Sequence, residues 1–382
     1  MKIIFLTLIL GYQVFAQTEN QTAPVPTTKT EEAQTLSWPR PSSLVFSGDF
    51  RYRYQSETQE PKETRKLQRL QVRLQADADV QKDLKFTLRL MTGSAANSGN
   101  QTLGDEKAPG MVRRGFGLDQ AYFDYKPFDI WNIYGGKMPQ PLTFVGKNQL
   151  ILDRDITLEG LATKMKTPIT DELQFFMQGG FFMIRENYDS TYSEDMTDNT
   201  LNVIQTGFIY HNEEWTATAG YGSFGFTGLK DNPPASLTAG ASNNGNTLDL
   251  SGNYPANFDL EEYFLEIKKK WSEFELSAFY ESVQNKDIEN LNKANSYGFI
   301  LNYKNLTASW AQQEVQKDAV VGLFSDSDFG GGQTSSRGQI YSLNYKLSKK
   351  TQLQYTVYKN TNSIDTAPAK YDRTHLDLMI NF

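Results

Sequence analysis

The sequence has no cysteine, only two histidines, and no long apolar run beyond its first residues. Without cysteine there are no disulfides and no thiolate metal sites, and two distant histidines give no support for a zinc site. A transmembrane helix needs about 20 consecutive apolar residues, which a chain of mean hydropathy -0.55 does not offer after its start. The net charge of -7 argues against nucleic acid as a partner. We expect neither a cofactor nor a bound metal.

The first residues have the pattern of a secretory signal peptide. Met1 and Lys2 precede the apolar run IIFLTLIL, and the small residues Val14 and Ala16 stand at the two positions of a cleavage site. The run is too short to span a bilayer. We predict a signal peptide over residues 1–16, cleaved after Ala16, and hence an exported protein.

The next segment, residues 17–44, is polar, contains several prolines and shows neither helical nor strand periodicity. Such composition is typical of a flexible linker. We predict a periplasmic lead-in over residues 17–44 and a single folded domain over residues 45–382.

The folded part shows a period of two from its first residues. In FSGDFRYRYQ, aromatic residues alternate with Asp49, Arg51 and Arg53, and in LQRLQVRLQADADV the aliphatic residues alternate with charged or amide residues. This alternation indicates strands with one apolar face and one polar face. About sixteen such segments follow one another, and an even count of that size is typical of bacterial outer-membrane barrels. The predicted strands are 46–56, 66–80, 83–92, 116–126, 130–138, 157–167, 172–185, 201–211, 214–223, 259–270, 273–282, 296–303, 305–314, 337–347, 351–360 and 372–382.

The connections between these segments alternate between short turns and loops of roughly nine to thirty-five residues, as in membrane barrels. A soluble β-sandwich gives no reason for that alternation, and its outward aromatics would form large apolar patches in water. We predict an all-β fold, a transmembrane antiparallel β-barrel of about sixteen strands with short periplasmic turns and long extracellular loops.

The chain ends on an aromatic residue that continues an apolar strand face. This ending resembles the C-terminal signal by which outer-membrane barrels are recognised and inserted, and the resemblance implies a location in the outer membrane. The resemblance implies, as partners, outer-membrane lipid and lipopolysaccharide together with the barrel assembly machinery. The residues of the predicted insertion signal are Leu376, Leu378, Ile380 and Phe382.

Several segments resemble a known family. The strings FSGDFRYRYQ, RLQVRLQADADV, MTGSAANSGNQTLGD, LDQAYFDYKP, YGGKMPQP and DRDITLEGLA look like successive signatures of the putative porin family of Gram-negative bacteria, over most of residues 45–185. The chain departs from the family pattern where Leu152, in place of an aromatic, precedes Asp153, and in its short N-terminal segment. The resemblance implies passive diffusion of small hydrophilic solutes and names no particular solute.

A barrel of this size is too wide for side chains to fill and leaves an aqueous channel. The inward positions of the first strands carry a ladder of cations, predicted to line the pore and to favour anions, since charged walls set pore selectivity. These residues are Arg51, Arg53, Arg69, Arg73, Lys85 and Arg89. By similarity to general porins, residues 139–156 are expected to fold inward as a constriction, with Asp153, Asp155 and Glu159 facing the ladder. The alternative is that this loop stays outside and that the arginines pair with Asp49, Asp77 and Asp79.

Other readings of the chain compete with a porin. A hydrolase on the barrel wall has little support, because a triad needs Ser, His and an orienting acid together and nothing in the sequence brings His211 or His375 into one; we expect no enzyme. A specific or gated transporter, or a barrel that binds partners at its surface without an open pore, remains the alternative. The long segments 224–258 and FSDSDFGGG are expected to be outer loops.

A homotrimer is expected by analogy with general porins.

Overall fold

The computed structural model describes residues 41–93, 98–105, 110–146, 149–187 and 197–382. The predicted signal peptide and residues 17–40 of the predicted lead-in lie outside the described residues. In the ranges described, no helix has the length and apolarity to cross a membrane. Three short 3-10 helices are present there, η1 (Pro234–Ser236), η2 (Gly322–Phe324) and η3 (Phe329–Gly331).

The described residues form one antiparallel sheet of seventeen strands. The strands are β1 (Ser43–Gln59), β2 (Arg65–Gln81), β3 (Leu84–Thr92), β4 (Gln101–Thr102), β5 (Phe116–Phe128), β6 (Trp131–Pro139), β7 (Thr157–Pro168), β8 (Leu173–Arg185), β9 (Asn199–His211), β10 (Trp215–Thr227), β11 (Phe258–Lys270), β12 (Phe274–Asn285), β13 (Lys293–Tyr303), β14 (Leu306–Val315), β15 (Ser336–Lys346), β16 (Thr351–Asn362) and β17 (Ala369–Asn381).

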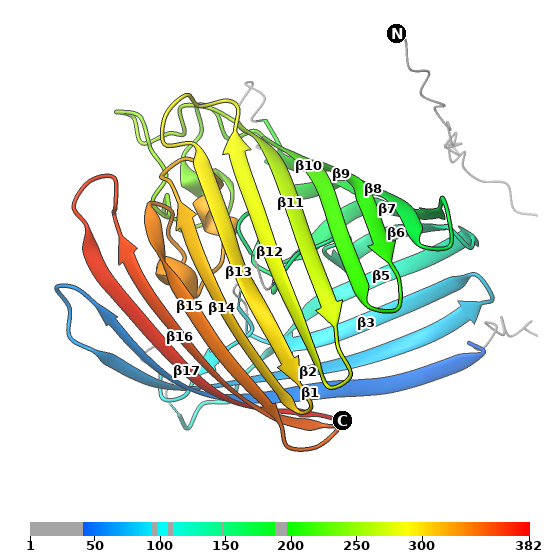
Figure 1. Ribbon diagram of the computed structural model, residues 1–382. Coiled ribbons are helices and arrows are strands. Elements are labelled where there is room, and N and C mark those ends of the chain that lie inside the picture. The colour runs from blue at the N-terminus through cyan, green and yellow to red at the C-terminus, as the bar shows by residue number, and fades with distance from the viewer. Residues whose placement is uncertain (1–40, 94–97, 106–109, 147–148, 188–196) are drawn as a thin grey trace, which may run out of the picture. The chain divides into compact units, whose positions relative to one another are not determined.

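The sheet closes on itself, because β17 pairs with β1 over the whole register from Asp49↔Asn381 to Gln59↔Tyr371 (Figure 1). β4 has only two residues and pairs with β2 beyond the end of β3. The ring therefore has sixteen long strands, which confirms the predicted fold. A closed ring leaves no unpaired strand edge, so the backbone hydrogen bonds are satisfied within the sheet.

The two faces of the barrel follow the alternation of the sequence. In β1, Tyr52 and Tyr54 lie opposite Leu378 and Leu376 of β17, and cross-strand partners share a face. The residues between them, such as Arg53, lie on the other face and are buried. Leu376 is 49% exposed, as expected of a residue on the outer surface.

The first two strands are longer than predicted, with 17 residues each. Their alternation fades in the polar segment after Gln55, yet the pairing of β1 with β17 continues to Gln59. The loop between them is therefore only residues 60–64. Two more connections at the same end, 286–292 and 363–368, are also shorter than the predicted nine residues. The remaining connections keep the predicted alternation of short turns and long loops.

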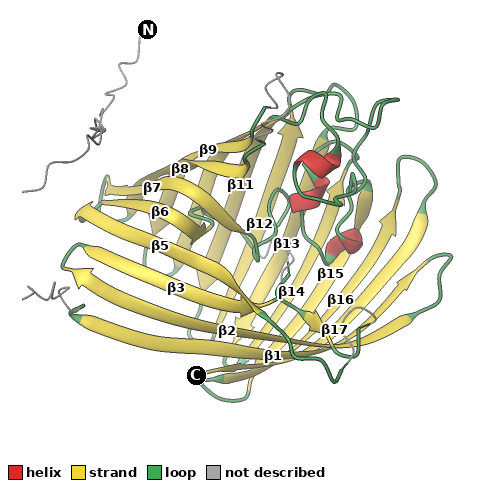
Figure 2. Cartoon of the chain, turned by 180° about the vertical axis from the view of Figure 1, so that it is seen from behind, coloured by secondary structure: helices red, strands yellow, loops and turns green. Residues whose placement is uncertain are grey.

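The inner face is not polar throughout, although the alternation in the sequence indicated one polar face for each strand. Inward residues of β8 to β10, including Phe182, Leu201 and Phe226, are almost completely buried. They pack with apolar residues of three long loops, 140–156, 228–257 and 316–335, in one hydrophobic cluster. The short helices η1 to η3 belong to two of these loops (Figure 2). The segments expected to be outer loops, 224–258 and FSDSDFGGG, belong mostly to the 228–257 and 316–335 loops. Both loops contribute buried residues to this cluster, because burial removes their apolar side chains from water.

Candidate functional site: the barrel interior

The inward positions of β1, β2, β3 and β17 form what we call the basic wall. Its members are Arg51, Arg53, Arg69, Arg73, Lys85, Arg89 and Arg373. The first six are those predicted from the sequence, and β17 adds the last. Adjacent strands bring these side chains together because paired residues share a face.

Arg53 lies at the centre of the basic wall and is 5% exposed. Its Nε donates to Asp377 Oδ1 at 2.6 Å and its Nη2 to Asp377 Oδ2 at 3.1 Å. This is the bidentate arrangement in which guanidinium and carboxylate interact most strongly. Asp377, on the neighbouring strand β17, thus fixes the orientation of Arg53.

The cations toward the turn end of the wall are neutralised by acids on a neighbouring strand. The pairs are Arg73 with Asp49 at 2.8 Å, Lys85 with Asp79 at 3.7 Å, and Arg89 with Asp119. The alternative of local pairing therefore holds for Asp49 and Asp79, whereas Asp77 accepts hydrogen bonds from Gln75 and Thr87 and pairs with no described cation. Because Lys85 and Asp79 are both well exposed, that pair adds little stability.

Arg51 and Arg69 are different, because neither forms an ion pair with a carboxylate among the described residues. Arg51 donates from Nε and Nη2 to Asn100 Oδ1, at 3.1 and 2.9 Å. Arg69 donates to the backbone oxygen of Asn100 at 3.2 Å and to Gln55 Oε1 at 3.2 Å. Neutral oxygens orient these guanidinium groups without cancelling their charge.

The 316–335 loop reaches the basic wall through Asp328. Its carboxylate lies 3.3 Å from Arg53 Nη1, 2.8 Å from Arg373 Nη1 and 3.7 Å from His375 Nδ1. Burial opposes ionisation, but the guanidinium charges of Arg53 and Arg373 hold the pKa of Asp328 well below its usual range. The loop is thus attached to β1 and β17 by a carboxylate that stays charged.

The 140–156 loop lies against the opposite side of the barrel. The Thr143 N–H donates to Gln205 Oε1 at 2.8 Å, and the Gly146 N–H donates to Glu266 Oε1 at 3.3 Å. Val145 is buried in a cluster with aromatic residues of β8, β11 and β12. Gly146 has a φ of 59°, and a Cβ there would lie 2.5 Å from the ring of Phe279, so only glycine fits this contact.

The two loops meet inside the barrel. The Asp153 N–H donates to the Phe324 oxygen at 2.7 Å, and the Ser327 N–H donates to Asp153 Oδ2 at 2.9 Å. Burial raises the pKa of Asp153 to about 6. Together the 140–156 and 316–335 loops connect the wall of β9 to β12 with the wall of β17 and β1, and we call this unit the loop bridge.

The 228–257 loop packs against the loop bridge. Asn246 Nδ2 donates to the backbone oxygens of Lys317 and Val320 at 2.9 and 2.8 Å. The Thr247 N–H donates to Asp318 Oδ1 at 2.7 Å. These bonds to the start of the 316–335 loop hold it in its inward conformation.

The three predicted acids do not act together. Asp153 is 4% exposed in the contact between the loops, and does not face the arginines. Asp155 is half-buried and close enough to Arg51 to interact electrostatically. The expectation for Glu159 was wrong, because Leu158 takes the inward position in β7 and Glu159 points to the other face, where it pairs with Lys137 at 2.6 Å. Among the described loop residues, Asp328 is the acid that forms ion pairs with arginines of the basic wall.

Other residues of the interior were missed by the sequence reasoning. Glu262, Glu266 and Glu281 are buried on the inward faces of β11 and β12. The alternation in FDLEEYFLEIKKK predicts their inward position, because Glu262 and Glu266 alternate there with outward Tyr263 and Leu265. Arg373 was visible in the same way, by its parity with His375.

The C-terminal residues complete the barrel seam. Phe382 and Gly48 exchange two backbone hydrogen bonds of 3.0 Å each. The Phe382 ring covers Gly48, where a Cβ would lie 2.6 Å from the ring. The predicted insertion residues thus lie on the last strand and its end, at the closure with β1.

Comparison with known proteins agrees with this architecture. Residues 40–249 and 235–382 match the family model described as putative porin. No curated protein sequence matches the chain significantly.

Solved structures of outer-membrane proteins are similar in fold. OmpF of Salmonella typhi, in complex with daunomycin, is 13% identical with a TM-score of 0.53, over 89% of this chain and 97% of that one. OprB of Pseudomonas putida is 12% identical with a TM-score of 0.56, over 89% and 94%. An OmpT variant of Vibrio cholerae that lacks loop L8 is 12% identical with a TM-score of 0.50, over 89% and 99%. At this identity the likeness concerns the fold. With the match of the family model to both halves of the barrel, the chain belongs to the putative porin family.

Proposed function

We propose that the protein is an outer-membrane channel for the passive diffusion of small hydrophilic solutes, narrowed by the loop bridge and with a preference for anions. The observation that carries the proposal is the charged interior of a closed ring of sixteen long strands. A ring of that size leaves an aqueous passage that side chains of the wall alone do not fill.

The preference for anions is argued from the uncompensated part of the basic wall. Arg51 and Arg69 keep their charge among neutral oxygens, whereas Arg73, Lys85 and Arg89 are paired with acids. Asp155 acts on Arg51 only from beyond ion-pair distance, so neither guanidinium group is paired with a carboxylate among the described residues. Such a cation beside a water-filled passage attracts anions from solution. We therefore assign selectivity to Arg51 and Arg69 rather than to the whole predicted ladder.

The second candidate function is a gated channel. It is favoured by one observation, namely that polar contacts of single carboxylates attach the loop bridge to the basic wall, through Asp328, and join its halves, through Asp153, in addition to its apolar packing. Such an element can have docked and undocked states. Gating and passive diffusion are compatible, and the difference lies in how long the bridge stays undocked.

The remaining expectations belong to this proposal as well. The signal peptide with cleavage after Ala16, the contacts with lipid and lipopolysaccharide, the insertion by the barrel assembly machinery through Leu376 to Phe382, and a homotrimer are proposed by analogy with outer-membrane barrels.

Liposome swelling tests the proposal of passive diffusion. Vesicles that contain the refolded mature chain are expected to swell in neutral solutes at rates that fall with solute size and do not saturate with concentration. Heat-modifiable migration on gels first verifies that the chain is folded. Folded protein that leaves the swelling at the rate of empty vesicles would contradict an open passage.

A further inference from the structure

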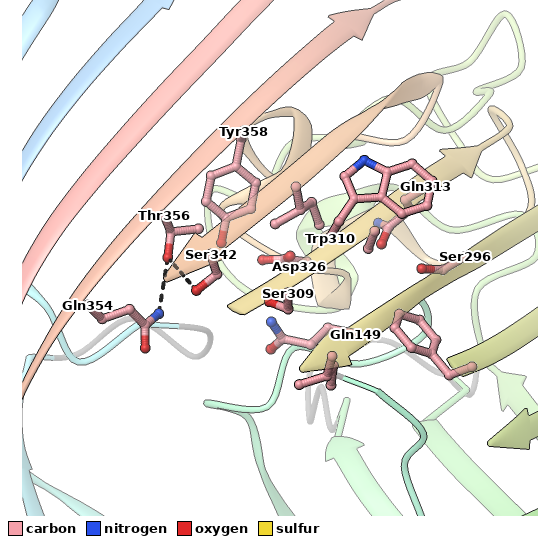
Figure 3. Close-up of a pocket in the computed structure, with 14 residues that line it drawn as sticks. Gln149, Ser296, Ser309, Trp310, Gln313, Asp326, Ser342, Gln354, Thr356 and Tyr358 are labelled. Carbon is pink, nitrogen blue, oxygen red and sulfur yellow. Dashed lines mark hydrogen bonds between the residues drawn. The ribbon is translucent and has the colours of Figure 1, made fainter. Parts of the chain in front are cut away.

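A cavity of about 150 Å³ lies inside the barrel, between the inner face of β12 to β16 and two residues of the inward loops, Gln149 and Asp326 (Figure 3). Its volume is far above the roughly 10–15 Å³ that one water molecule requires. None of the residues that line it is lysine, arginine or histidine. The cavity is therefore chemically distinct from the basic wall.

The strands present hydroxyl and amide groups to this cavity. They occupy inward positions of four consecutive strands, β13 to β16, where paired residues share a face. Six of the side chains are those of serine, threonine or glutamine, namely Ser296, Ser309, Gln313, Ser342, Gln354 and Thr356, and Tyr358 of β16 adds a phenolic hydroxyl group. Each hydroxyl or amide group can both donate and accept a hydrogen bond.

Three of the six serine, threonine and glutamine side chains have no hydrogen-bond partner among the described residues. Gln354 Nε2 donates to Thr356 Oγ1 at 3.1 Å, and Thr356 Oγ1 donates to Ser342 Oγ at 3.3 Å. In contrast, the side chains of Ser296, Ser309 and Gln313 form no hydrogen bond in the described part of the chain, and their polar atoms are not sealed from the cavity. A row of oriented polar groups with unused capacity fits a ligand that supplies the missing bonds.

Asp326 adds a carboxyl group near Ser309 and Ser342 (Figure 3). It is 7% exposed, accepts the Asp328 N–H at 2.9 Å, and forms no ion pair with a described cation. Burial, together with the charges of Asp328 and Asp153, raises the pKa of Asp326 to about 8. Near neutral pH this carboxyl is largely protonated, so it too can both donate and accept.

We propose that this cavity is a binding site for a neutral solute with several hydroxyl groups, of the size and chemistry of a monosaccharide. Hydroxyl groups that donate and accept match the serine, threonine and glutamine side chains, and Phe279 offers an apolar flank for the carbon frame. An anionic solute would meet the Asp326 carboxyl and no cation, whereas a cationic one would find no second acid among the lining residues. The inference rests on the proposed channel only in that solutes reach the cavity through the lumen.

Binding of D-glucose to the detergent-folded full barrel, followed by saturation-transfer NMR over a concentration series, tests this site. The wild type is expected to show saturable binding that glucuronate and glucosamine match only at concentrations at least tenfold higher. Ser296→Ala/Ser309→Ala is expected to weaken glucose binding at least tenfold, and Gln313→Leu serves as a second variant if the first does not fold. Ser282→Ala is the matched control, since Ser282 pairs with outward Tyr263 in the same sheet.

The proposal is overturned if glucose shows no saturation with the wild type, if the charged sugars bind as well as glucose, or if the cavity variants bind like the control. The measurement does not require ion or solute flow. A barrel that binds glucose and yet causes no vesicle swelling would overturn the proposed channel and leave this site standing, whereas swelling without glucose binding would do the reverse.

Discussion

Replacing Asp328 by asparagine is expected to release the loop bridge from the basic wall. The substitution keeps the shape of the side chain and removes the charge that lies 3.3 Å from Arg53 and 2.8 Å from Arg373. Each arginine keeps one other carboxylate, Asp377 for Arg53 and Glu57 for Arg373. The two guanidinium groups would then face each other across a neutral amide.

The size of the effect follows from burial. Removing one partner of a buried ion pair costs roughly 3–5 kcal/mol. Asp328 keeps a side-chain exposure of 22%, and both arginines retain a partner. We therefore expect the free energy that favours the docked loop to fall by about 2–3 kcal/mol, at or just below the lower limit of that range. At about 1.4 kcal/mol per factor of ten, the undocked fraction of the 316–335 loop rises roughly 30- to 150-fold.

Single-channel current noise and limited proteolysis measure this fraction. Asp328→Asn is expected to give larger current fluctuations and faster cleavage within residues 316–335 than the wild type. Asp231→Asn is the control, because Asp231 is exposed on another loop and forms no ion pair in the described structure. If Asp328→Asn behaves like Asp231→Asn in both assays, the electrostatic attachment of the loop is refuted.

Three further predictions concern other parts of the barrel. Gly146→Ala places a methyl group 2.5 Å from the Phe279 ring at a φ of 59°, and is expected to displace the 140–156 loop and change the conductance, which bilayer recording measures; an unchanged conductance would contradict the packing. The pKa values of Asp153 and Asp326 are raised to about 6 and about 8 in the docked loops, so the docked loops bind these protons more tightly than undocked loops. Docking is therefore strongest at low pH, and it weakens as the pH rises through these two values. Current noise should therefore increase from pH 5 to pH 9, and noise that decreases over this range would contradict the sign. Leu74→Arg places a cation on the outer face, where Leu74 is 43% exposed, and should lower the insertion yield in vesicles by a cost of roughly 2–4 kcal/mol at the membrane midplane; a yield equal to wild type would show that this residue does not face lipid.

The strand pattern of the barrel could be predicted because its signal is local. Alternation with period two marks each strand, and the same alternation assigns Arg53 inward and Leu376 outward, as the cross-strand register shows. The prediction for Glu159 failed because a shift of one residue along a strand exchanges the inward and the outward face. Leu158 takes the inward position in β7, so Glu159 lies on the outer face.

The contacts of the inward loops could not be predicted from the sequence in the way that the strands were, because they join residues far apart in the chain. Asp153 bonds with Ser327, and Asn246 with Val320, and no local period encodes such pairs. One sequence signal did exist. In LQFFMQGGFFMI, residues such as Phe176 and Phe182 are apolar on the inward face as well, which indicates a strand covered on both sides.

The reversal potential of single channels under a salt gradient tests the central claim most directly, for the wild type and for Arg51→Gln/Arg69→Gln. Both arginines are held by neutral oxygens, so their replacement removes charge without leaving a described carboxylate unpaired. The account predicts stable ohmic steps, a preference for anions in the wild type, and loss of that preference in the double variant. A folded wild-type barrel that gives no conductance steps would contradict the account. A double variant that keeps the anion preference of the wild type would contradict it as well.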